Sequence, residues 1–83
     1  MNEAIYTSLS RSDYVVYANR VVLGNVVIPR SAITKLLWVE PDKSFPGMLQ
    51  IFVSTLSPIS IQVLYDLRQD FIDFKSAIES ILM

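Results

Sequence analysis

The chain has 83 residues, of which 52% are hydrophobic and 18% charged, and its seven basic and eight acidic residues leave a net charge of −1. This length allows one small domain with one core. The absence of cysteine and histidine excludes zinc-finger, iron–sulfur and haem ligation, disulfides, thiol nucleophiles and imidazole bases, so that only carboxylate metal sites remain. We therefore expect no cofactor, no metal and no enzymatic activity.

Charge and hydropathy also limit the partners and the location of the chain. Residues 1–40 carry four basic and three acidic side chains, and residues 41–83 carry three and five. Neither half has the cluster of Lys and Arg that nucleic-acid binding needs, so we expect no nucleic-acid partner. Because Glu3 is acidic and Thr7, Ser8 and Ser10 follow it, we expect no secretion signal. The apolar stretch 21–29 is too short to span a bilayer. We expect a cytoplasmic location, with which the lack of cysteine is compatible.

The first third of the chain has the composition of short antiparallel strands. Residues 4–9 are interpreted as a first strand or an ordered arm, and residues 8–13 as a polar turn. β-Branched and aromatic residues predict three further strands, at residues 14–17, 21–23 and 26–28. Residues 18–20 and Gly24-Asn25 are predicted to form the tight turns between them. Pro29 ends the last of these strands because it has no N–H to donate.

Residues 33–39 are predicted as a longer strand that needs cover on both faces. Alternation places Ile33, Leu37 and Val39 on one face, which we interpret as the core face. Trp38, together with Leu36, then falls on the opposite face.

Two more strands follow a polar loop at residues 40–47. In residues 48–55, one face is predicted to carry Leu49, Ile51 and Val53, and the other Gln50, Phe52 and Ser54. Residues 59–65 alternate in the same way, with four apolar residues on the predicted core face: Ile59, Ile61, Val63 and Tyr65. This second strand is therefore half-buried.

The hydrophobic period changes after Tyr65 and predicts an amphipathic helix over residues 66–82. Its predicted core positions are Leu67, Phe71, Phe74, Ile78 and either Ile81 or Leu82. Asp66 is predicted as the N-cap, with Gln69 completing a capping box. Asp70 and Asp73 are assigned to the polar side, and we interpret the three aspartates as favourable helix N-terminal charge and not as a cation site.

The element order predicts the fold class α+β. Strands come first and the helix last, with no crossover helix that could make the strands parallel. We expect residues 1–83 to form a single domain: a bent antiparallel β-sheet of about five to six strands, closed by one C-terminal amphipathic helix. Residues 1–13 are its arm or first strand, residues 14–65 its sheet and residues 66–82 its helix.

Three segments carry a family resemblance. Residues 26–36 (VVIPRSAITKL), residues 46–51 (PGMLQI) and residues 59–63 (ISIQV), followed by a closing helix, resemble the short bacterial pleckstrin-homology-like (PH-like or GRAM-like) domains. The resemblance spans about residues 14–82. It implies a bent antiparallel sheet plugged by the helix, which serves as a binding or assembly platform without catalysis. Lipid-binding members hold phosphoinositides with Lys and Arg in the first hairpin loop, where this chain offers Arg20, with Arg11 nearby in sequence.

Five large side chains are candidates for an interface because alternation places them opposite the predicted core faces. They are Tyr14, Trp38, Met48, Phe52 and Leu64. A domain this small with 52% apolar residues has more apolar side chains than its interior readily hides, and aromatic residues and Met are enriched in interfaces. The same side chains could instead fill a two-sided core.

The leading hypothesis is a non-catalytic domain that self-associates, most simply as a dimer, or docks a protein partner. The alternative is a peripheral module that binds phospholipid at a membrane surface through Arg11 and Arg20. No residue pattern in the chain specifies a ligand.

Overall fold

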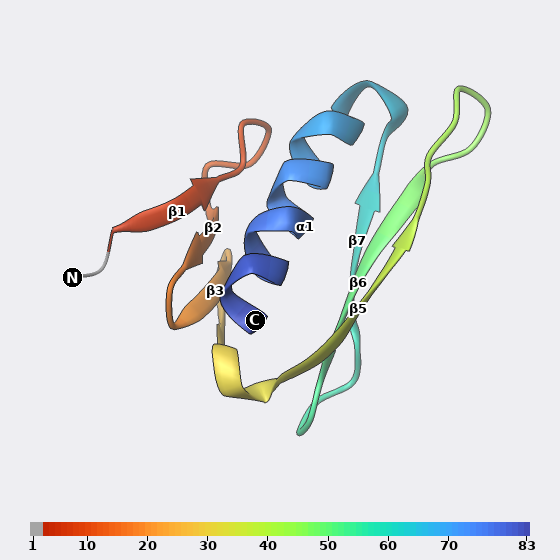
Figure 1. The fold of residues 1–83 in the computed structure, drawn as a ribbon. Coiled ribbons are helices and arrows are strands. Elements are labelled where there is room, and N and C mark those ends of the chain that lie inside the picture. The colour runs from red at the N-terminus through yellow and green to blue at the C-terminus, as the bar shows by residue number, and fades with distance from the viewer. Residues whose placement is uncertain (1–2) are drawn as a thin grey trace.

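Two antiparallel sheets and a C-terminal helix make up the computed structural model, which describes residues 3–83 (Figure 1). The first sheet contains β1 (Ala4–Thr7), β2 (Tyr14–Tyr17), β3 (Arg20–Leu23) and β4 (Val26–Pro29), in that order across the sheet. The second contains β5 (Ile33–Val39), β6 (Gly47–Val53) and β7 (Ile59–Val63). The 3₁₀ helix η1 (Arg30–Ala32) joins the sheets, and η2 (Tyr65–Leu67) leads into α1 (Arg68–Leu82).

The predicted α+β class is confirmed, but the strands form two sheets where one bent sheet was expected. Among residues 3–83 there are seven strands, where about five to six were expected. Within the predicted arm or first strand, Ala4–Thr7 form a strand, since β1 pairs antiparallel with β2, whereas residues 1–2 lie outside the described residues. Pro29 ends β4 as predicted, and η1 follows it directly, so that the chain leaves one sheet and begins another.

The β3–β4 turn depends on a glycine. Gly24 has φ +63°, a conformation that L side chains rarely adopt, and its N–H donates to the Asp13 carbonyl at 3.0 Å. We expect Gly24→Ala to lower the free energy of unfolding by about 1 kcal/mol, because alanine is strained in this left-handed conformation. Urea unfolding followed by Trp38 fluorescence measures this, with Asn25→Ala as the matched control. An unchanged Gly24→Ala midpoint would show that the turn relaxes without cost.

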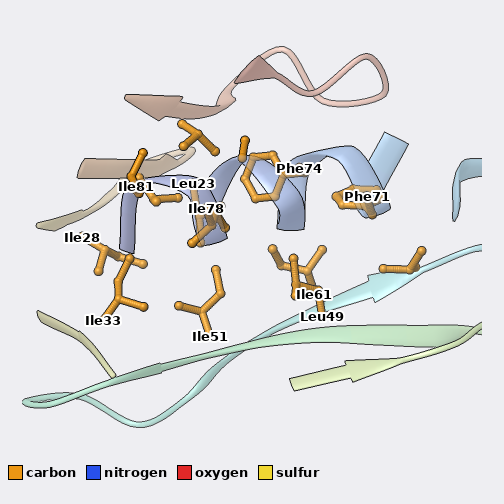
Figure 2. Packing of buried hydrophobic residues seen from close by; sticks show 14 residues of the cluster. Leu23, Ile28, Ile33, Leu49, Ile51, Ile61, Phe71, Phe74, Ile78 and Ile81 are labelled. Carbon is orange, nitrogen blue, oxygen red and sulfur yellow. The ribbon is translucent and has the colours of Figure 1, made fainter. Parts of the chain in front are cut away.

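The core lies between the sheets, and α1 fills it (Figure 2). The helix contributes Phe71, Phe74, Ala77, Ile78 and Ile81. The first sheet contributes Val16, Val21, Leu23 and Ile28, and the second contributes Ile33, Leu49, Ile51, Ile61 and Val63. The predicted core positions on the helix are therefore confirmed, with Ile81 in place of Leu82 and with the exception of Leu67, which is exposed.

The helix begins two residues later than predicted, and the predicted capping box is wrong. Asp66 lies within η2, and Leu67 occupies the N-cap position without a side-chain hydrogen bond. Gln69 instead donates to Asp73 Oδ1 at 3.0 Å, one helical turn further along. Because Leu67 belongs to the 3₁₀ turn, whose angular period differs from that of an α-helix, it does not continue the apolar stripe of α1.

The predicted faces of β5 are wrong over most of its length. Its pairing with β6 shifts register between Ile33 and Lys35, which marks an irregularity of the β-bulge type. One additional residue in a strand reverses which side chains face the core. Ile33 is therefore buried, but Leu37 and Val39 are exposed, and Trp38 packs against the core.

Among the described residues 3–83, no helix is long and apolar enough to cross a membrane. The α-helix α1 has 15 residues, of which several on its outward side are charged.

Candidate interaction surface

The structure separates the five predicted interface residues. Tyr14 and Trp38 are half-buried and pack against the core, so their assignment to outward faces is wrong. Tyr14 shares a strand face with buried Val16, and its ring centroid lies 6.2 Å from that of Phe74. Trp38 is turned inward by the register shift in β5, and its Nε1 donates to Glu40 Oε1 at 2.9 Å.

Met48 and Phe52 belong to the surface of the second sheet that lies away from the helix (Figure 1). We define this outer face by eight residues: Lys35, Leu37 and Val39 of β5, Met48, Gln50 and Phe52 of β6, and Ser60 and Gln62 of β7. Cross-strand neighbours pair Lys35 with Phe52, Leu37 with Gln50, and Val39 with Met48. The neighbouring residues of β6, Leu49 and Ile51, point into the core (Figure 2).

The outer face is apolar on one side and polar on the other. Leu37 and Val39 are 43% and 44% exposed, and Met48 and Phe52 beside them are half-buried. Across β6 the surface becomes polar, and Gln50 Nε2 donates to Ser60 Oγ at 3.2 Å.

Among the eight outer-face residues, the one charged side chain is Lys35. Its ammonium lies 4.6 Å from the centroid of the Phe52 ring, a cation–π contact that covers the aromatic face without introducing an acidic partner. The outer face thus presents an apolar strip with little charge.

Sequence reasoning missed Leu37 and Val39, which are the most exposed apolar residues of this face. Regular alternation assigned them to the core, and nothing in the local sequence marks the register shift that turns them outward. The one sequence feature that indicated exposed apolar residues was their number, which exceeds what a small core can hold. It does not say which residues are exposed.

Leu64 is exposed but lies beyond the end of β7, beside the β5–β6 loop. It lines an open hollow of about 500 Å³ together with residues 42–46, Tyr65 and Asp66. Arg68 stacks over the Tyr65 ring at 3.7 Å, and Lys43 lies 5.9 Å from the same ring. Leu64 is therefore part of a separate, mixed surface.

Arg11 and Arg20 do not converge on one site. The Arg11 guanidinium lies 4.3 Å from the ring centroid of Tyr14, and that of Arg20 lies 4.0 Å from the ring centroid of Tyr17. These tyrosines stand at opposite ends of β2. Because β1 is a strand, the first hairpin loop is residues 8–13 and not residues 18–20, so that Arg11 is its one basic residue.

A second feature lies at the start of the helix, where Asp70 is 8% exposed although it was predicted on the polar side. Its carboxylate accepts hydrogen bonds from Tyr6 Oη at 2.6 Å, Ser8 Oγ at 2.7 Å, the Leu9 N–H at 2.9 Å, and both the N–H (3.1 Å) and the hydroxyl of Ser10. We call this group the Asp70 clasp. It joins β1 and the β1–β2 loop to α1, and it explains why an aspartate is buried on this helix.

The clasp controls the ionisation of its members. Burial by itself raises the pKa of Asp70, but hydrogen bonds from Ser10, Tyr6, Ser8 and the Leu9 N–H outweigh it and hold the pKa well below its ordinary value. Burial and the adjacent carboxylate together raise the pKa of the Tyr6 phenol. Asp70 therefore remains an ionised acceptor whose oxygens are already occupied by donors, an arrangement suited to holding the chain together.

Among residues 3–83, no group of acidic side chains is arranged to hold a metal ion. Comparisons with protein-family models, curated proteins and solved structures found no match.

Proposed function

We propose that this domain is a non-catalytic protein-interaction module whose outer face pairs with a second copy of the chain. The supporting observation is the exposed apolar strip of Leu37 and Val39, flanked by Met48 and Phe52, on a sheet whose other face is filled by the helix. Burial of such a strip removes apolar area from water. One lysine on the face, held over Phe52, presents little repulsion to a second copy.

The size of the face implies weak association. Strands β5 and β6 have seven residues each, so the face is about 23 Å long and, with three strands, about 14 Å wide. A footprint of about 300 Å² is well below the roughly 800 Å² per partner that stable interfaces bury. The proposed dimer therefore forms at high protein concentration and dissociates on dilution.

The PH-like resemblance belongs to the same proposal. The resemblance implies antiparallel strands plugged by a helix, and the chain has a four-stranded and a three-stranded antiparallel sheet followed by a C-terminal helix. We place this platform in the cytoplasm, with which the absence of cysteine is compatible.

We expect Leu37→Glu to abolish self-association. The change places one carboxylate from each copy within the apolar strip, where association would have to desolvate both charges. Light scattering behind a sizing column, over a hundredfold range of concentration, should show the wild-type mass rise toward two chains while the variant retains the mass of one. Urea unfolding of the variant should stay close to wild type, because Leu37 is already exposed.

Val27→Glu is the matched control. Like Leu37, Val27 is an exposed apolar residue on a strand, but it lies in β4 of the other sheet, so this variant should associate like wild type. A wild-type chain that remains a monomer at every concentration, or a Leu37→Glu variant that associates as strongly as wild type, would refute the proposal.

A further inference from the structure

Strand β1 is attached to the domain differently from the other strands. Among residues 3–83, the buried hydrophobic core contains side chains from β2 to β7 and from α1, but none from β1. Ala4, Ile5 and Thr7 are exposed, and Tyr6 is half-buried. The hydrophobic effect therefore holds β1 in place only weakly.

The backbone pairing of β1 is also limited. β1 has four residues and lies at the edge of its sheet. In the described part of the chain its one neighbour is β2, and the pairing is irregular between Ala4 and Tyr6. On its other side, β2 pairs with β3 through three residue pairs that do not involve β1. Detachment of β1 therefore breaks one short ladder and leaves the remaining sheet intact.

The remaining attachment is concentrated on one carboxylate. All five donors of the Asp70 clasp come from residues 6–10. Beside the clasp, the Ser8 N–H donates to the Tyr14 carbonyl at 2.9 Å, and the half-buried Tyr6 ring packs against the core, with its centroid 6.4 Å from that of Phe74 in an edge-to-face contact. Asp70 is thus the one group that accepts hydrogen bonds from both ends of residues 6–10.

We propose that residues 4–10 form a strap that opens as a unit while the rest of the fold stays closed, and that Asp70 is its latch. Opening frees the edge of β2, and a free strand edge is a template for pairing with a strand of another chain. The strap thus controls access to an edge on the first sheet. This device is independent of the outer face of the second sheet and does not rest on the proposed self-association.

Native-state hydrogen exchange of the full-length protein tests the strap, with amides read individually by NMR at several low urea concentrations. In the wild type, amides of β1 should exchange through an opening that depends weakly on urea, whereas amides of β6 and α1 should exchange only through an opening that depends strongly on urea. Asp70→Asn should accelerate exchange in β1 on the order of tenfold to a hundredfold. Asp73→Asn, an exposed aspartate on the same helix, should leave it unchanged.

A core variant separates the strap from global unfolding. Ile51→Val removes one methylene from a fully buried side chain of β6 and should speed exchange of the β6 and α1 amides several-fold. It should not change exchange in β1, because the core stays closed when the strap opens. If Asp70→Asn fails to fold, Tyr6→Phe and Ser10→Ala remove donors from the strap and should accelerate the β1 amides in its place.

Two results would overturn the proposal. If Ile51→Val accelerates the β1 amides by the same factor as the core amides, β1 unfolds only with the whole domain and there is no strap. If none of the three clasp variants accelerates β1 exchange, Asp70 is not the latch.

Discussion

Phe74→Ala is expected to cost about 3–5 kcal/mol of the free energy of unfolding, the usual range for a buried phenylalanine. The Phe74 side chain is fully buried in the core (Figure 2). Its ring centroid lies 6.1–6.4 Å from those of Tyr6, Tyr14 and Phe71. Deletion of this ring leaves a cavity between the helix and the first sheet. A domain of 83 residues has a total stability of about 4–12 kcal/mol, so the loss is a large part of the whole.

Urea unfolding monitored by the fluorescence of Trp38 gives the free energy of unfolding for wild type and variant. Leu82→Ala is the control on the same helix, and it should cost well under half as much because Leu82 is 36% exposed. Equal losses for Phe74→Ala and Leu82→Ala would show that the two sheets collapse around the missing ring.

Asp70→Asn is expected to lower the free energy of unfolding by about 1.5–3 kcal/mol at pH 7, the range for hydrogen bonds to a charged group. Asparagine has nearly the same shape as aspartate, but one of the two acceptor oxygens is replaced by an NH₂ group. That group is a donor and cannot accept the hydrogen bonds of the surrounding hydroxyl and N–H groups. Asp73→Asn is the control, since Asp73 is exposed and accepts one hydrogen bond from Gln69. A loss for Asp70→Asn no larger than for Asp73→Asn would contradict the importance of the clasp.

The difference between wild type and Asp70→Asn should depend on pH in one direction. The folded protein holds the pKa of Asp70 below its ordinary value, so the unfolded chain takes up the proton first as pH falls. The stabilisation is therefore fully present above the ordinary aspartate pKa of about 4 and is lost progressively below it. Urea unfolding from pH 6 to pH 2 should show the two proteins converge at the acid end. A constant difference across this range would mean that the charge of Asp70 does not contribute.

Local sequence patterns were sufficient to predict the strands, the helix and most of the buried residues. β-Branched runs separated by turn residues predicted the strands from β2 to β7, and the spacing of Phe71, Phe74, Ile78 and Ile81 predicted the buried stripe of α1. These signals are local, because a strand repeats every two residues and a helix every 3.6. The α+β class follows from the order of such elements along the chain.

The candidate interaction surface could be predicted only in part. Met48 and Phe52 lie on the outer face, as alternation along β6 indicated, because the pairing of β6 with β7 is regular. Trp38 and Leu37 exchanged faces, because a register shift in β5 depends on how that strand meets β6 and not on its own residues.

By itself, the sequence determined the strand and helix segments, the α+β class and the absence of cysteine and histidine chemistry, since each of these depends on composition or on neighbours within a few residues. The tertiary structure decided which apolar residues of β5 face outward and why Asp70 is buried. The partners of Asp70 lie 60 to 64 residues away in the chain. No local period links a carboxylate on the last helix with hydroxyls on the first strand and the loop after it, so only the packing of these segments against α1 could reveal the clasp.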